Sequence, residues 1–170
     1  MHVFDRSRAS IPGPVPAVRS WSGPSSIQWA LRALGALSLL AVGAVHLQQY
    51  STLYSSIPTI GTLFVLNFVG ASVIGLGLLA PVERLFGRLG RALPTLLALG
   101  GIALAATAFV FLLISERTPL FGFMEPGYDP AAILASRVSE AATVLFLGAF
   151  LAVRHAQSRE ATPRRPTEPK

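Results

Sequence analysis

The sequence predicts an all-α integral membrane protein, a four-helix bundle with disordered basic tails and both termini in the cytoplasm. Three observations support this fold class. Only 13% of the 170 residues are charged and 52% are hydrophobic, whereas soluble domains carry about 25% charged residues. The apolar residues form four blocks, each long enough to cross a hydrocarbon layer of about 30 Å. Basic residues flank these blocks, which is the pattern that membrane topology requires.

The two ends of the chain are predicted to be disordered cytoplasmic tails, at residues 1–26 and 154–170. The first tail has four prolines and three arginines without a periodic apolar face, and the second has five basic residues and three prolines. Such compositions do not bury enough apolar surface to fold. The first apolar block also begins too late, and is too long, for a secretory signal.

One transmembrane domain is predicted over residues 27–153. Its first span, residues 27–50, ends in the sequence HLQQY. The second span, residues 59–79, begins after Pro58 and ends before Pro81, because proline interrupts helices. The glycines of its GASVIGLG segment predict a close contact between helices, since small residues let helix backbones approach in a bilayer.

The third span, residues 92–114, is rich in alanine and glycine. The fourth span, residues 131–153, carries Arg137 and Glu140 in its first half. At about 1.5 Å per residue, these charges lie about 9 and 13 Å inside the hydrocarbon layer. A charge near a helix centre costs about 2.5–3.5 kcal/mol on insertion scales, so we expect both side chains to face protein or water.

The distribution of basic residues predicts the topology. Twelve of the fourteen lie in the first tail with Arg32, in the 81–91 loop and in the second tail, whereas the two loops on the other side hold only Arg117. The positive-inside rule then predicts both termini in the cytoplasm. Thirteen of the fourteen basic residues are arginine, which suggests a GC-rich bacterial source, so the expected location is the bacterial cytoplasmic (inner) membrane. The net charge of +6 is therefore interpreted as orientation and contact with the lipid bilayer, not as binding of nucleic acid.

With this topology, His46, Asn67, Arg137 and Glu140 all fall in the outer half of the membrane. We predict an outward-facing polar pocket in which Glu140 binds a proton or cation and Arg137 tunes its charge. His46 would be a titratable or ligating partner and Asn67 a hydrogen-bonding wall. The alternative is structural: Arg137 pairs with Glu140 and reaches outward, and Asn67 forms a hydrogen bond between helices.

The loop after the third span, with the sequence LFGFMEPGYDP, is predicted to cover the outer end of the bundle as a lid. Phe121 and Phe123 are apolar enough to lie on the bundle, and Glu125 would reach the polar cluster. The glycines and prolines of the loop impose turns. Of the two interpretations, the sequence favours the other one, an interfacial aromatic belt with a solvated acid.

The sequence predicts no catalytic residue, metal site or cofactor. It has no cysteine, which excludes disulfides, thiolate metal sites and iron–sulfur clusters. It contains no HExxH, P-loop, dinucleotide fingerprint or nucleophile elbow. A haem-, quinone- or metal-dependent redox protein is the least favoured function, because only one histidine, His46, lies within a span.

Three motifs occur in order along residues 46–150: HLQQY, IPTIGTLFVLN and LFGFMEPGYD, followed by a glutamate within the last span. This combination resembles a group of small, uncharacterised four-span membrane proteins of actinobacterial type. The resemblance implies the four-span fold, and it implies no activity, substrate or cofactor. The positions that it marks as important are His46, Pro58, Gly61, Asn67, Gly122, Glu125 and Glu140.

Two main functions stay open from the sequence. The first is the binding or movement of a small solute, ion or proton at the polar pocket. The second is a non-catalytic subunit or scaffold of a membrane complex. In that case a membrane-protein partner or a second copy of the chain would contact the glycine-rich faces of the second and third spans.

Overall fold

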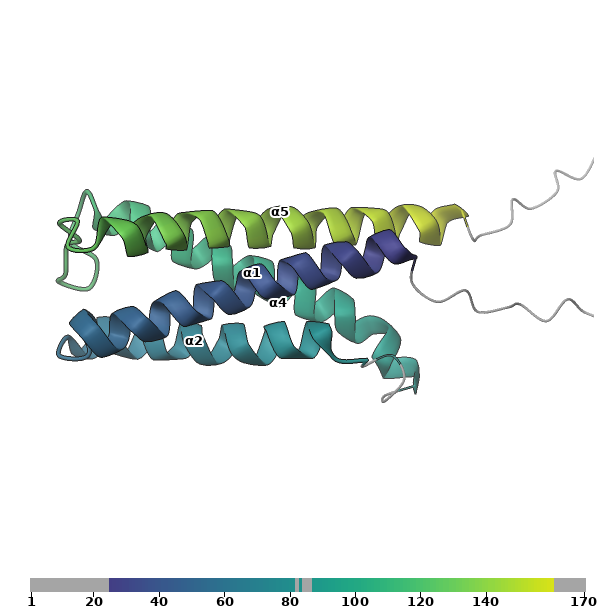
Figure 1. Ribbon diagram of the computed structural model, residues 1–170, viewed down its shortest axis with the longest axis horizontal. Coiled ribbons are helices and arrows are strands. Elements are labelled where there is room, and N and C mark those ends of the chain that lie inside the picture. Colours follow the sequence, from purple (N-terminus) through teal and green to yellow (C-terminus); the bar gives the residue numbers. More distant parts are fainter. Residues whose placement is uncertain (1–24, 82, 84–86, 161–170) are drawn as a thin grey trace, which may run out of the picture.

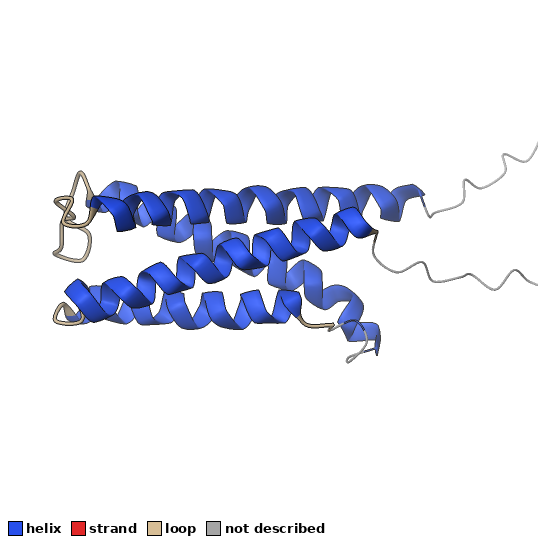
Figure 2. Cartoon of the chain, in the orientation of Figure 1, coloured by secondary structure: helices blue, strands red, loops and turns tan. Residues whose placement is uncertain are grey.

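The structure, a computed structural model, describes residues 25–81, 83 and 87–160. Four helices are long and apolar enough to cross a membrane, and the described residues contain no β-strand. This confirms the predicted multi-pass helical bundle (Figures 1 and 2). The elements are α1 (Ser26–Gln49), the π-helical turn η1 (Tyr50–Tyr54), α2 (Pro58–Leu79), α4 (Gly87–Ser115) and α5 (Pro130–Glu160).

The residues at the helix starts explain where these helices begin. Ser25 Oγ accepts a hydrogen bond of 3.4 Å from the amide of Gln28 and so caps α1. Pro58 occupies the first turn of α2, where no hydrogen-bonded amide is needed. Asp129 caps α5, because its Oδ1 accepts a hydrogen bond of 3.0 Å from the amide of Ala132.

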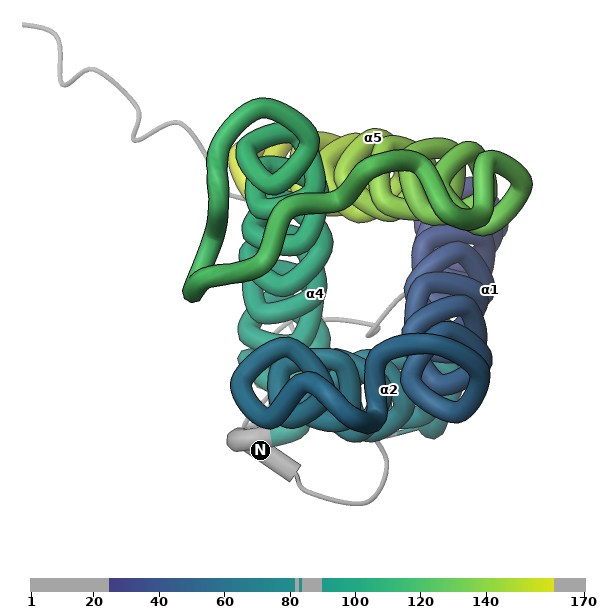
Figure 3. The backbone as a smooth tube through the Cα atoms, turned by 90° about the vertical axis from the view of Figure 1, so that its left-hand side faces the viewer, coloured from purple at the N-terminus to yellow at the C-terminus, as the bar shows by residue number. Residues whose placement is uncertain are grey.

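The four helices form a square in the end-on view, in the order α1, α2, α4, α5 (Figure 3). α1 packs closely against both α2 and α5. The connections at residues 50–57 and 116–129 lie at one end, on the left of Figure 1, which we call the loop end. The first described residue of α1 and the last of α5 lie at the opposite end, the terminal end.

Glycines allow this close packing. A Cβ on Gly75 of α2 would lie 2.8 Å from Leu40 Cγ of α1, and one on Gly43 of α1 would lie 3.1 Å from Ala71 Cβ of α2. The glycine-rich segment of α2 therefore forms a helix contact, as the sequence predicts, and the contact is with α1 of the same chain.

A tightly packed apolar cluster fills the bundle towards the terminal end. Its members come from α1, α2, α4 and α5 and are at most 2% exposed: Ala36, Leu78, Ala98, Leu147 and Phe150. We call this group the core cluster. An ion pair between Arg32 and Glu83 lies on the same side, with side chains 7% and 17% exposed.

Two helices are longer than the predicted spans. α4 begins at Gly87, within the predicted loop, and α5 continues to Glu160. The prediction of a disordered tail is therefore wrong for residues 154–160. These residues include good helix formers, and Gln157 is held by Gln28, whose Nε2 donates to Gln157 Oε1 at 2.7 Å. The predicted first tail up to residue 24, and residues 161–170, lie outside the described residues.

Candidate functional site

A cavity of about 510 Å³ lies within the bundle, on the side of the loop end. All four long helices contribute to its wall, and so does the 116–129 segment, which we call the lid. Along α2 it runs from Ile60 to Ile74, about 21 Å at ~1.5 Å per residue. Small-molecule sites have volumes of about 300–1,000 Å³. Most lining side chains are apolar, and the polar ones are His46, Tyr54, Asn67, Thr107, Ser115, Glu125, Ser136 and Glu140.

Glu140 is the most unusual residue of this wall. Its side chain is 1% exposed, and its Oε2 atom has no hydrogen-bond partner. Asn67, across the cavity on α2, is 8% exposed, and its Oδ1 atom also lacks a partner. Buried polar atoms are nearly always hydrogen-bonded in folded proteins. Two of the residues that line the cavity therefore each carry a buried acceptor atom without a partner.

His46 lines the same cavity from α1. Its ring centroid lies 5.0 Å from that of Phe64. Its Nδ1 lies 2.9 Å from the carbonyl oxygen of Val42. A carbonyl oxygen only accepts, so Nδ1 donates this hydrogen bond.

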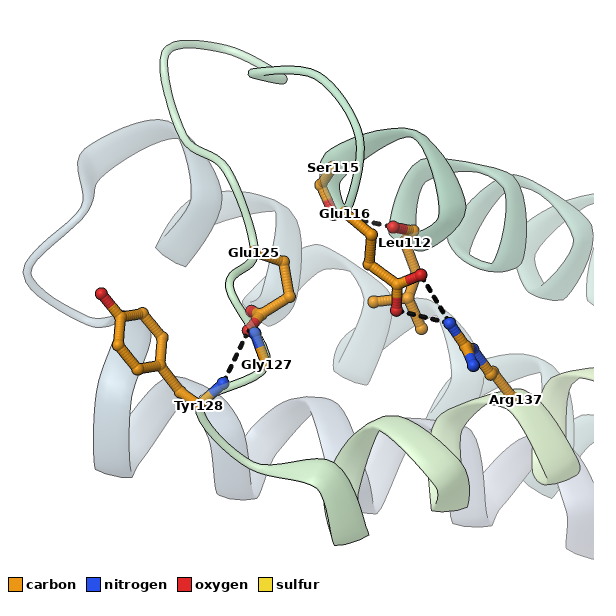
Figure 4. A network of polar contacts seen from close by, with 7 residues as sticks. All are labelled: Leu112, Ser115, Glu116, Glu125, Gly127, Tyr128 and Arg137. Carbon is orange, nitrogen blue, oxygen red and sulfur yellow. Dashed lines mark hydrogen bonds and ion pairs between the residues drawn. The ribbon is translucent and has the colours of Figure 1, made fainter.

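Arg137 is the predicted member that the structure places elsewhere. It does not line the cavity. Its guanidinium Nη2 instead lies 2.5 Å from both carboxylate oxygens of Glu116, at the end of the lid next to α4 (Figure 4). The side chains of this pair are 39% and 26% exposed. The expected contact between Arg137 and Glu140 is thus replaced by a partly exposed ion pair at the loop end.

Glu125 fastens the lid over the cavity. Its carboxylate accepts hydrogen bonds from the hydroxyl of Tyr54 and from the amides of Gly127 at 2.9 Å and Tyr128 at 3.1 Å. The amide of Glu125 donates to the carbonyl oxygen of Ser115 at 2.8 Å. Figure 4 shows the carboxylate turned towards the two loop amides. Glu125 is 7% exposed, so the favoured expectation of a solvated acid is wrong.

The two phenylalanines of the lid lie differently. Phe123 lines the cavity and packs edge-on against Tyr54, with ring centroids 5.4 Å apart. Phe121 adopts a positive φ of 53°, which turns its side chain outwards. Phe121 is 56% exposed and contacts Phe111 of α4 at a centroid distance of 6.1 Å. Of the three predicted lid residues, Phe123 and Glu125 reach the cavity and Phe121 does not.

Asp129 ties the lid to α1 as well as capping α5. Gln49 Nε2 donates a hydrogen bond of 2.9 Å to Asp129 Oδ2. The bonds from Ala132 and then from Gln49 hold the pKa of Asp129 below its ordinary value. A carboxyl whose folded pKa is lowered stabilises the fold above its unfolded pKa, and this stabilisation is lost as the pH falls through the folded pKa.

We therefore expect the lid to loosen on acidification below about pH 4, the ordinary aspartate range. The variant Gln49→Leu removes one donor to Asp129, so its loosening is expected to begin at a higher pH. An environment-sensitive fluorophore on a single cysteine at Tyr128 reports the transition. The matched control is Gln48→Leu, at the exposed neighbouring position. Identical midpoints in wild type and Gln49→Leu would contradict the role of Asp129.

Sequence reasoning missed three residues of the site. The only sequence signal for Tyr54 is its place in an uncharged stretch before Pro58. Glu116 is one of three acids between residues 116 and 129, and nothing in the sequence indicates that it pairs with Arg137. Thr107 lies in a span in which nearly every residue is apolar, so the sequence did not show that it would face the cavity.

Among residues 25–81, 83 and 87–160, no group of three or more histidine, aspartate or glutamate side chains is placed to hold a metal ion. The structure thus places His46, Asn67 and Glu140, from three helices, on the wall of one cavity, together with Glu125 of the lid. No protein-family model, curated protein or solved structure matches the chain.

Proposed function

We propose that this protein binds a small solute, ion or proton in the cavity around Glu140. We further propose that it lies in the bacterial cytoplasmic membrane with both termini in the cytoplasm, so that the lid faces outwards. One observation supports the binding function above all: Glu140, about 13 Å inside the apolar bundle at ~1.5 Å per residue, lines a cavity of about 510 Å³, and one of its carboxylate oxygens has no hydrogen-bond partner. Ionisable groups within a membrane are costly and usually functional.

The two ends of the cavity differ in a way that supports access from the loop end. Towards the terminal end, the core cluster packs without exposure, and a Cβ on Gly101 would already lie 2.9 Å from Leu147 Cδ1. Towards the loop end, the wall is a non-helical lid held by a few polar contacts, chiefly Tyr54 to Glu125. Segments held by few contacts open more readily than packed helices.

The scaffold function has less support. The glycines that were expected to receive a partner lie against helices of the same chain: Gly75 against Leu40 of α1, and Gly101 against Leu147 of α5 and Leu39 of α1. A partner is therefore not needed to explain these small residues. The unpaired oxygen of Glu140 has no explanation in a scaffold.

The test measures whether water-borne molecules reach the cavity. Single cysteines replace Ser136, which lines the cavity, and Val138, which is 60% exposed on the opposite side of the same helix. A third cysteine replaces Tyr128, which is 67% exposed in the lid. Intact cells receive a membrane-impermeant thiol reagent. We expect Tyr128→Cys to be labelled fastest, Ser136→Cys more slowly and Val138→Cys least. The reagent reacts with the thiolate, which forms only where water reaches the side chain.

A second substitution opens the lid. A hydrogen bond to a carboxylate contributes about 1.5–3 kcal/mol, so Tyr54→Phe is expected to raise labelling of Ser136→Cys about tenfold or more. Tyr50→Phe is the matched control, since Tyr50 lies in the same turn with its ring beside Gly61. If Ser136→Cys stays unlabelled in both backgrounds while Tyr128→Cys reacts, water does not reach the cavity and access from the loop end is wrong.

A further inference from the structure

The cavity also reaches the side of the bundle, between α2 and α4. Leu66 of α2 lines the cavity and is 60% exposed. Ala103 and Thr107 of α4 line it and are exposed as well. α2 packs less closely against α4 than against α1. Leu66 is about 12 Å from the start of α2 at ~1.5 Å per residue, so this opening faces the hydrocarbon core of the membrane.

The charges of the cavity select for one kind of ligand. Among the described residues of its lining there are two acids, Glu125 and Glu140, and no arginine or lysine. Glu125 already accepts three hydrogen bonds. Arg137, the nearest basic residue on α5, is paired with Glu116. Glu140 therefore has no counter-charge on the described wall, and an anion would meet repulsion instead of a partner.

The rest of the cavity wall favours a ligand with a large apolar surface. Leucine, isoleucine and alanine side chains of α2 and α4 cover most of it, and Phe64, Phe111 and Phe123 add aromatic rings. Burial of apolar surface favours a hydrophobic ligand, and aromatic faces attract organic cations. The cavity volume fits a molecule of drug size.

We infer that the ligand is a lipophilic organic cation, which enters from the bilayer between α2 and α4 and places its positive charge against Glu140. This inference rests on the proposed function and names the ligand class and its route. The lid then separates the bound cation from the water at the loop end, and the core cluster separates it from the terminal end.

The binding test uses the purified full chain in phosphatidylcholine nanodiscs, whose zwitterionic lipid does not concentrate cations. Tetraphenylphosphonium is the probe, and tetraphenylborate has the same shape with the opposite charge. We expect the cation to bind at least ~10-fold more tightly than the anion, and Glu140→Gln to weaken cation binding at least ~10-fold. The control Glu160→Gln makes the same substitution at an exposed position of α5 and is expected to bind as wild type does.

The route is tested by the association rate. Ala103→Trp narrows the opening and is expected to slow association of tetraphenylphosphonium several-fold. Leu99→Trp is the control, because Leu99 is 51% exposed one turn away and does not line the cavity. Size-exclusion profiles and helical circular dichroism confirm that each variant is folded.

Each outcome decides a separate point. Equal affinity for the two ions, or unchanged affinity in Glu140→Gln, would overturn the cation inference. Absence of cation binding while Ser136→Cys is still labelled from water would overturn it too, and would leave the proposed solute site standing. Absence of both would overturn both proposals. An unchanged association rate in Ala103→Trp would overturn entry from the bilayer.

Discussion

Gly35→Leu is expected to lower the free energy of unfolding by at least about 3 kcal/mol. At Gly35, α1 packs closely against α5: a Cβ there would lie 2.4 Å from Leu147 Cδ2 and 3.3 Å from the backbone nitrogen of Leu147. Overpacking a filled core costs about 1–3 kcal/mol for small additions, and here α5 itself must move. Unfolding in mixed sodium dodecyl sulfate micelles, followed by circular dichroism, measures the change.

Gly148→Ala provides the matched control on α5. Gly148 is the neighbour of Leu147 along the chain, and a Cβ there meets nothing within 4 Å. This variant is expected to be neutral or more stable by up to about 1 kcal/mol, because alanine favours helix more than glycine does. Wild-type stability in Gly35→Leu, or an equal loss in Gly148→Ala, would show that the α1–α5 contact is not the cause.

The number of helices and their approximate bounds could be predicted from the sequence, because the thickness of the membrane sets their length. A hydrocarbon layer of about 30 Å requires about 20 apolar residues, and Pro58 and Pro81 bound the second block closely. Helix ends in water follow a different rule, which explains the error at the last helix. Hydropathy falls at Arg154, but the backbone hydrogen bonds continue to Glu160, since charged residues are good helix formers too.

The error at Arg137 has a geometric cause. Residues three apart on a helix are neighbours, so the sequence suggested that Arg137 pairs with Glu140. Spacing along one helix, however, does not show which partners the neighbouring elements offer. Arg137 meets Glu116 at the end of the lid next to α4, and Glu140 lines the cavity instead.

The sequence does not show how each span is rotated about its own axis. A helix that is apolar all round does not reveal which face is buried, and this is the case for α2 and α4. Asn67 was recognisable because it is polar, and it does face the cavity. Leu66 and Ala103 are apolar like most of their neighbours, so the opening between α2 and α4 could not be predicted and is visible only in the structure.

Glu140→Met is expected to raise the stability of the protein while it abolishes ligand binding. The buried, unpaired Oε2 atom costs about 1–3 kcal/mol in the free protein, and methionine has a similar length without the polar atoms. If Glu140 instead held the helices together, its removal would lower stability. The direction of the change in unfolding free energy therefore separates a binding residue from a structural one.

Thr143→Val is the control for this comparison. Thr143 lies one turn further along α5, is 0% exposed, and donates its hydroxyl to the carbonyl oxygen of Ser139 at 2.8 Å. Because this hydrogen bond stays within the helix, its loss is expected to cost only about 0.5–1.5 kcal/mol. A stabilised Glu140→Met beside a slightly destabilised Thr143→Val means that the chain retains Glu140 at the expense of its own stability. Selection tolerates such a cost where a ligand needs the group.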